Sequence, residues 1–141
     1  MLELKVKRIH EAARLPRYGH RGDAGLDLFS IESRLFEPGE VKPVRTGIQV
    51  SIPEGYVGLI WDKSGISLNG VHRLAGVIDS GYRGEVKVVL VNLGRKDFAV
   101  DAGMKIAQLL IQKVFEVTVI DSGVLDDTPR GGKGFGSTGK F

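Results

Sequence analysis

Short β-type segments separated by glycine and proline constrain the fold of this chain more than any other feature. Apolar and polar side chains alternate, and β-branched residues recur, in four segments: Val41–Ile52, Tyr56–Trp61, Glu85–Asn92 and Ile106–Val119. A period of two residues is typical of β-strands, and the Pro-Gly, Glu-Gly and Ala-Gly pairs between the segments are typical of turns. Only Ile9–Arg14 and Ser64–Asn69 favour helix, and both are short. The sequence therefore predicts an all-β sandwich or barrel with at most one or two short helices.

Two stretches within these segments, Val86–Val91 and Ile106–Val114, are apolar at almost every position. Neither face of such a strand can be turned to water, so we expect both strands to be buried on both sides. Contacts between subunits would cover one face of each strand, and two strands inside a monomeric sandwich would show the same pattern.

The size of the chain indicates a single domain, because 141 residues leave no room for a second core. A hydrophobic share of 42% is enough to bury that core, which excludes disorder of the whole chain. We assign the domain to residues 1–125. Residues 126–141 are so rich in glycine that we expect a flexible C-terminal segment without regular structure.

Several classes of chemistry and location are excluded by composition. The absence of cysteine removes disulfides, thiolate nucleophiles and Cys-ligated metals. His10, His20 and His72 lack the spacing of metal ligands. No apolar run approaches the roughly 20 residues of a membrane span, and the first nine residues alternate charged and apolar side chains, unlike a signal peptide. We therefore expect a cytoplasmic protein with no membrane partner.

The glycine-rich end of the chain has the spacing of a phosphate-binding Walker A loop at Gly134–Lys140. That loop requires Ser or Thr after the lysine and a helix behind it, whereas Phe141 follows here and the chain then stops. A P-loop nucleotidase is therefore excluded. The segment keeps groups that can stack, pair charges and donate hydrogen bonds.

Five short motifs occur in order along the chain: Ala24–Leu28 (AGLDL), Trp61–Gly65 (WDKSG), Gly76–Gly84 (GVIDSGYRG), Gly103–Leu109 (GMKIAQL) and Arg130–Gly139 (RGGKGFGSTG). Each motif alone is weak, but the ordered set resembles the five motifs of the trimeric deoxyuridine triphosphate nucleotidohydrolase (dUTPase) family. The resemblance covers essentially the whole domain.

This resemblance implies a distorted jelly-roll or β-clip barrel that assembles as a homotrimer. Three active sites lie between subunits, and each is closed by a C-terminal lid from a neighbour. The implied reaction is the Mg²⁺-assisted attack of water on the α-phosphate of dUTP, which yields dUMP and pyrophosphate. It limits uracil in DNA and supplies dUMP for dTMP synthesis. No nucleic-acid partner is expected.

The resemblance assigns three polar residues to the reaction itself. Asp79 is the catalytic base, and it follows an apolar stretch, residues 75–78, whose low dielectric would favour proton uptake. Asp27 holds the metal through water, and Gln108 lies near the phosphates. From the residues alone, Asp79 could equally cap a turn, Asp27 could end a strand, and Gln108 could bind backbone in the core.

The remaining positions are assigned to substrate binding. Lys63, Ser64 and Gly65 match the phosphate-binding motif, although most relatives have Arg where Lys63 stands, and Lys offers a point charge instead of a planar fork. Tyr82 would pack under the deoxyribose and exclude a 2′-hydroxyl. The small Ala75 and Gly76 would let backbone read the uracil edge. The lid would contribute Phe135, stacked on the base, and phosphate contacts from these residues: Arg130, Gly136, Ser137 and Thr138.

Three alternative functions compete with the hydrolase. A dCTP deaminase of the same fold has an Asp-Pro-Gly-aromatic stretch similar to Asp79–Tyr82, but its catalytic Glu would stand where this chain has Val89. A non-catalytic nucleotide-binding regulator would bind dUTP without turnover. A β-barrel that binds single-stranded nucleic acid is suggested by the pI near 9.3, but it would need a ladder of exposed aromatic residues. Gly81 also replaces the second Asp found in many dUTPases.

Overall fold

The computed structural model describes residues 2–139, and nearly all of its regular structure is β. Within that range the elements are, in chain order, β1 (Lys5–Arg8), β2 (Leu26–Phe29), β3 (Arg34–Phe36), β4 (Val41–Ser51), β5 (Tyr56–Trp61), α1 (Ser64–Ser67), β6 (Val71–Leu74), β7 (Val77–Ile78), β8 (Glu85–Asn92), β9 (Phe98–Val100) and β10 (Lys105–Lys113). This confirms the predicted all-β fold with a short helix. Met1, Lys140 and Phe141, to which part of the domain assignment and the Walker-type comparison refer, lie outside the described residues.

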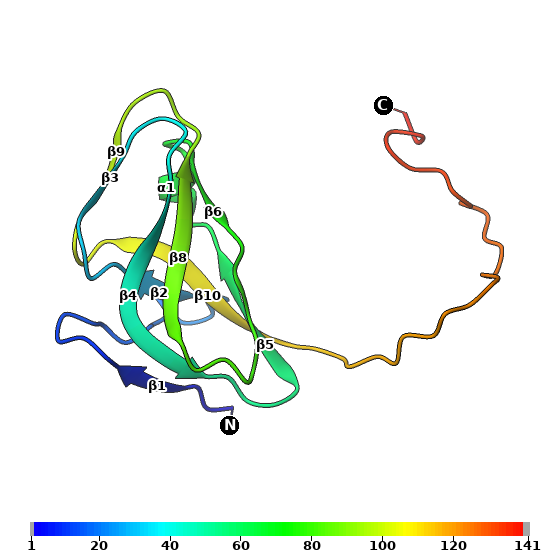
Figure 1. Cartoon of the computed structure of the whole chain (residues 1–141), viewed down its shortest axis with the longest axis horizontal. Helices are drawn as coiled ribbons and strands as arrows, with labels where there is room; N and C mark the ends of the chain where they lie inside the picture. Colours follow the sequence, from blue (N-terminus) through cyan, green and yellow to red (C-terminus); the bar gives the residue numbers. More distant parts are fainter. Residues whose placement is uncertain (1, 140–141) are drawn as a thin grey trace.

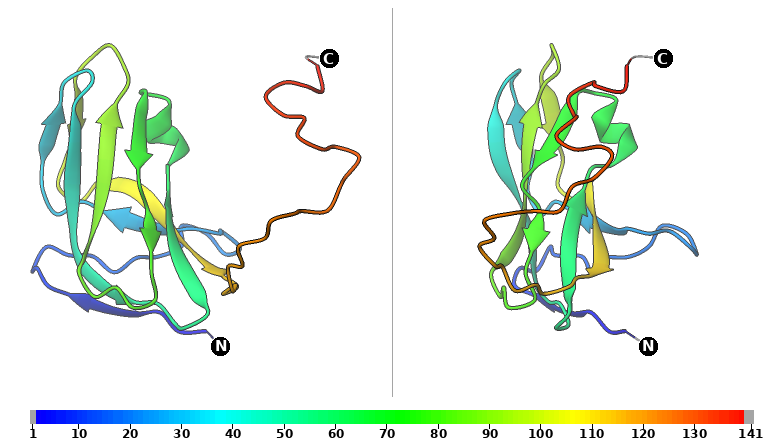
Figure 2. Two further views of the ribbon diagram at one scale, coloured as in Figure 1. Left: turned by 45° about the vertical axis from the view of Figure 1, so that its right-hand side comes forward. Right: turned by 90° about the vertical axis from the view of Figure 1, so that its right-hand side faces the viewer.

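The strands form two four-stranded sheets that face each other and a small additional pair. The first sheet has the order β1-β4-β8-β6, the second has the order β2-β10-β5-β7, and β3 pairs with β9. All of these pairings are antiparallel. Figures 1 and 2 show β4 and β8 side by side in one layer and β5 and β10 in the other. Antiparallel neighbours that are not consecutive in the chain are typical of a jelly-roll arrangement.

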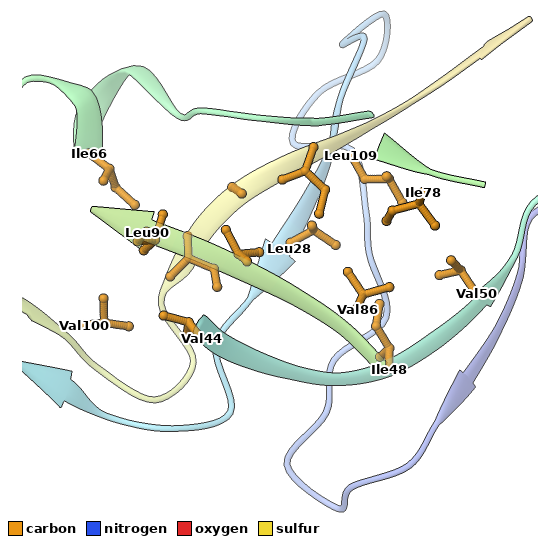
Figure 3. Packing of buried hydrophobic residues seen from close by; sticks show 14 of the residues in the cluster. Leu28, Val44, Ile48, Val50, Ile66, Ile78, Val86, Leu90, Val100 and Leu109 are labelled. Carbon is orange, nitrogen blue, oxygen red and sulfur yellow. The ribbon is translucent and has the colours of Figure 1, made fainter. Parts of the chain in front are cut away.

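The core lies between the two sheets. Leu28 of β2 and Leu109 of β10 point toward Val86 and Leu90 of β8 (Figure 3), and each of these side chains is at most 1% exposed. Burying one such aliphatic side chain contributes about 1.5–3 kcal/mol to folding. The packing therefore fixes β2, β5, β8 and β10, which carry or border the polar groups of the candidate site.

Burial on both faces is confirmed for only part of the two apolar strands. In β8, Val91 is buried on the face opposite the core residues, Val89 is half-buried, and Lys87 is exposed. In β10, burial on both faces is limited to the first half of the strand, which includes Ile106 and Ala107.

Two predicted elements differ from the structure. The strand predicted over Ile106–Val119 ends at Lys113, and no strand partner lies beside the exposed side chains that follow. The helix predicted over Ile9–Arg14 is a turn, in which the amide of Ala13 donates to the carbonyl of His10 (3.1 Å) and the amide of Ala12 donates to His10 Nδ1 (3.1 Å). The imidazole acceptor favours this turn over a helical continuation.

Residues 114–139 form a long segment without helix or strand. This segment leaves the end of β10 and runs away from the two sheets (Figures 1 and 2). The lack of regular structure predicted for the glycine-rich end is confirmed up to Gly139, and it begins already at Val114. Among residues 2–139, no helix is long and apolar enough to cross a membrane.

Candidate active site

A cavity of about 300 Å³ brings together four of the residues predicted to form the site. Ala75, Gly76, Asp79 and Tyr82 all line it, at the place where β7 follows β6 and turns toward β8. The sequence did not identify Glu85, which also lines this cavity. Both of its carboxylate oxygens accept hydrogen bonds from Arg45 Nε (3.1 Å each), so its negative charge is already paired.

The backbone at the lip of this cavity is strained. Ala75 has φ of 59° and Gly76 has φ of 117°, so the strand expected over residues 75–78 is reduced to Val77–Ile78. A left-handed conformation at a non-glycine residue costs about 1–2 kcal/mol. Gly76 cannot carry a side chain without displacement, because a Cβ there would lie 3.0 Å from the carbonyl oxygen of Ile60. Such an outlier in a cavity wall is typical of a binding site.

Asp79 begins a tight turn at the rim of the cavity. The amide of Tyr82 donates to the carbonyl of Asp79 (3.1 Å), and the hydroxyl of Tyr82 donates to the carbonyl of Glu85 (3.0 Å). Asp79 is exposed in the single chain, so the prediction that it lies in surroundings of low dielectric is wrong for this chain. The two-residue β7 is an edge strand and is too short to enclose the carboxylate that follows it.

A second cluster surrounds Asp27 on β2. This carboxylate is only 3% exposed, and its oxygens pair with two ammonium groups: Oδ1 with Lys63 Nζ (2.5 Å) and Oδ2 with Lys105 Nζ (2.8 Å). Burial alone would raise the pKa of Asp27, but the hydrogen bonds and charges of Lys105 and Lys63 outweigh it and hold that pKa below its ordinary value. Asp27 is therefore a buried anion.

Gln108 connects this cluster to the motif that contains Lys63. Its Nε2 donates to the carbonyl of Asp62 (2.8 Å), and a Cβ at Gly25 would overlap its side chain. The backbone hydrogen bond considered from the sequence is therefore present. Gln108 also stands opposite Asp27 in the pairing of β10 with β2.

Ser64 and Gly65 are exposed at the start of α1, directly after Lys63. The buried Ile66 anchors this short helix in the core. The predicted phosphate-binding stretch is thus held next to the Asp27 cluster by the buried Ile66, by the pairing of Lys63 with Asp27 and by the hydrogen bond of Gln108 to Asp62.

The tail residues contact neither group. Arg130 Nε donates to the carbonyl of Lys133 within the tail (3.1 Å), and the ring of Phe135 is fully exposed. The segment that also holds Gly136, Ser137 and Thr138 stands away from the sheets in Figure 1 and in the left view of Figure 2. In this single chain the lid does not cover the cavity of its own subunit.

The residues around Asp27 can accept a metal only together with further ligands. Within residues 2–139 no group of three or more His, Asp or Glu side chains is arranged to hold an ion. Asp27 already has both oxygens paired with lysine. A Mg²⁺ ion at this place would need the oxygens of a polyphosphate and water as its main ligands.

Comparison with known proteins agrees with this geometry. A family model described as dUTPase matches residues 11–139. The deoxyuridine 5′-triphosphate nucleotidohydrolase of Alkaliphilus metalliredigens is 45% identical over 142 residues, covering 99% of both chains. That of Clostridium kluyveri is 48% identical over 141 residues, covering 98% of this chain and 99% of that protein.

Solved structures give the same result. The dUTPase of Staphylococcus bacteriophage 80alpha with dUPNHPP superposes with a TM-score of 0.91 at 31% identity, covering 98% of this chain and 99% of that one. A mutant dUTPase from phage phi11 of S. aureus, described with a structural Mg(II) ion, has a TM-score of 0.81 at 30% identity over 86% of this chain and 97% of that one. The chain therefore belongs to the dUTPase family of deoxyuridine 5′-triphosphate nucleotidohydrolases.

Proposed function

We propose that this protein hydrolyses dUTP to dUMP and pyrophosphate through the cavity lined by Ala75, Gly76, Asp79 and Tyr82. The observation that carries the proposal is the grouping of these four residues in one cavity of a chain that matches the dUTPase family over residues 11–139. In the cell the reaction would limit uracil in DNA and supply dUMP.

The cavity would hold the deoxyuridine part of the substrate. The backbone of Ala75 and Gly76 can approach the edge of a uracil because neither residue has a large side chain. The ring of Tyr82 would support the deoxyribose and leave no space for a 2′-hydroxyl. Recognition of an edge by fixed backbone groups rejects bases that leave those groups unpaired.

Asp79 would act as the general base. Its carboxylate stands at the rim of the cavity and is free to accept a proton from a water molecule that attacks the α-phosphorus. In the assembled site, a neighbouring subunit and the lid would reduce the exposure that Asp79 has in the single chain. The proton would move to the carboxylate while the pyrophosphate leaves.

The Asp27 cluster would serve the triphosphate. Lys63, Ser64 and Gly65 would bind phosphate oxygens, and Gln108 would hold that loop through the carbonyl of Asp62. Mg²⁺ would neutralise charge on the triphosphate, with Asp27 in contact with its water shell. The structural Mg(II) ion described for the phage phi11 enzyme supports a role for this metal.

A homotrimer with shared sites would complete the arrangement. In one chain Asp79 and Tyr82 of the cavity are exposed, and the same chain's tail stands away from the sheets in Figure 1. The tail of a neighbour would then bring Arg130, Phe135, Gly136, Ser137 and Thr138 to the nucleotide.

The direct test is pyrophosphate release from dUTP, dCTP, dTTP and UTP in the presence of Mg²⁺. We expect release from dUTP alone. Formation of dUTP from dCTP would favour a deaminase instead, and tight binding of dUTP without release would favour a regulator.

A further inference from the structure

Arg73 bridges the two halves of the candidate site, although no sequence motif includes it. Its guanidinium carbon lies 4.7 Å from the centre of the Trp61 ring, and its Nη1 donates to the carbonyl of Ala75 (2.8 Å). Its Nε lies 3.5 Å from Asp62 Oδ2. The side chain is only 19% exposed, so these contacts fix it in one place.

The carbonyl that Arg73 holds belongs to the strained lip of the cavity. Left-handed backbone at a non-glycine residue persists only where its surroundings enforce it. On one side the amide of Ile60 donates to the carbonyl of Gly76 (2.8 Å), and on the other Arg73 donates to the carbonyl of Ala75. Two hydrogen bonds therefore fix the two adjacent peptide units that line the cavity.

Asp62 orients Arg73 from the side of the phosphate-binding loop. Its Oδ1 accepts a hydrogen bond from the backbone amide of Arg73 (2.8 Å) and lies 3.0 Å from His72 Nδ1. Its carbonyl accepts a hydrogen bond from Gln108 Nε2 (2.8 Å). The residue that follows Asp62 is Lys63, which pairs with Asp27. A continuous set of contacts thus runs from the Asp27 cluster through Asp62 and Arg73 to the cavity lip.

We propose that Arg73 is a positioning residue that sets the affinity and selectivity of the cavity for uracil by holding the Ala75–Gly76 backbone in its reading conformation. This inference rests on the proposed function, because it concerns the same cavity. A planar guanidinium can stack on Trp61 and donate in its own plane to Ala75 at once. A lysine ammonium cannot do both.

The test compares Arg73→Lys with Arg34→Lys. Arg34, on β3, is a matched control because it is also a half-buried arginine paired with a carboxylate. Its Nε lies 2.9 Å from Glu32 Oε1, and it does not line the cavity. Loss of one well-formed hydrogen bond corresponds to about a tenfold change in binding. For Arg73→Lys we expect KM for dUTP to rise and dUMP affinity in calorimetry to fall by about tenfold, with kcat within about twofold of the parent. Preference for dUTP over dTTP and dCTP should fall in parallel.

Trp61→Leu provides a second variant that keeps the arginine. Trp61 is about half exposed, so its replacement leaves the core intact. It should shift KM and dUMP affinity in the same direction as Arg73→Lys. The two effects should not add, because both changes remove the same contact between the guanidinium and the Trp61 ring. Thermal unfolding of each variant checks that the fold is kept.

Two results would overturn the inference: a KM and dUMP affinity for Arg73→Lys equal to those of Arg34→Lys, or a fall in kcat with KM unchanged. If the parent binds dUMP but releases no pyrophosphate from dUTP, the proposed hydrolysis fails, while the difference in dUMP affinity still decides the role of Arg73. If the parent neither binds dUMP nor releases pyrophosphate from dUTP, both proposals fail.

Discussion

Asp27 has the most heavily paired carboxylate of the candidate site, with one lysine ammonium on each oxygen. A nearly buried anion is stable only with such partners, and removal of its charge leaves two ammonium groups close together without a counterion. Lys63 is therefore not a free phosphate ligand in this chain. Phosphate binding by Lys63 would require its ammonium to be shared between Asp27 and the substrate.

The low pKa of Asp27 predicts how stability depends on pH. A carboxyl whose pKa is lower in the folded than in the unfolded chain stabilises the fold above its unfolded value, and the contribution is lost as pH falls through the folded value. For Asp27 it is complete above about pH 5 and is lost below the ordinary value of 3.8. We expect Asp27→Asn to lower the free energy of unfolding by about 1–3 kcal/mol at pH 7, because the lysine partners are partly exposed.

The measurement is denaturant unfolding of the parent and of Asp27→Asn between about pH 2.5 and pH 7, a range that spans the titration of carboxyl groups. The difference in the free energy of unfolding between the two proteins should become smaller below pH 3.8. Asp121→Asn, in the exposed segment after β10, is the control and should follow the parent. A difference that is constant over the whole range would contradict this origin of the stability.

The role of Asp79 as the base can be tested by removing its charge. Asp79→Asn keeps the shape of the side chain but removes the base, and loss of general-base catalysis lowers turnover by about 10²–10⁴-fold. Because Asp79 is exposed, the melting temperature should not change. Pyrophosphate release measures the first effect, and dUMP titration should show affinity within about threefold of the parent. A variant that retains turnover within about tenfold of the parent would exclude Asp79 as the base.

The sequence identified four of the residues that line the cavity because Ala75, Gly76, Asp79 and Tyr82 lie within eight consecutive positions, joined by one short strand and one turn. The contacts of Lys105 with Asp27 and of Arg73 with Trp61 could not be predicted in the same way. They depend on how β10 pairs with β2 and β6 follows α1, which no spacing within a motif specifies.

At the scale of elements, the prediction succeeded where the alternation pattern coincides with a partner strand. β5 and β8 have the predicted bounds, and both pair with neighbours on two sides. The same pattern continues through residues 114–119, but among residues 2–139 no strand pairs with them. Alternating apolar and polar side chains show that a segment can form a strand. Whether the strand forms depends on a neighbouring strand to pair with, which the fold has to provide.

The turn between β6 and β7 can be tested by adding one methyl group. Gly76→Ala places a Cβ 3.0 Å from the carbonyl oxygen of Ile60 at a φ of 117°, which should lower the free energy of unfolding by about 1–3 kcal/mol. We also expect weaker dUMP binding, because the lip must move. For stability, Gly81→Ala is the matched control, since a Cβ there meets no atom within 4 Å. Equal melting temperatures for the two variants would show that the lip tolerates a side chain.

At the scale of the whole molecule, the sequence predicted the tail but not where it packs. Its glycines remove the preference for any regular element, and its hydrogen bonds, such as that of Arg130 to the carbonyl of Lys133, are local. The sheets have their core without it. In the proposed trimer, contacts with a neighbouring chain would give the tail its place.

Removal of residues 130–141 tests this separation of fold and function. The truncated chain should keep the melting temperature and the oligomeric state of the parent, measured by light scattering, because the core and the sheets are untouched. Turnover should fall by about 100-fold or more, because the proposed lid would exclude water and orient the phosphates. An unchanged rate would remove the lid from the mechanism.

Mixed trimers show whether the lid comes from a neighbour. Truncated subunits keep Asp79 but lack the tail, whereas Asp79→Asn subunits keep the tail but lack the base. If each site takes its cavity from one subunit and its lid from another, unfolding and refolding the two inactive proteins together in equal amounts should restore about a quarter of the parent turnover. The two variants refolded separately and then mixed without exchange are the control and should stay inactive. If each chain closes its own cavity, no mixed trimer contains a complete site, and the refolded mixture should be as inactive as the control.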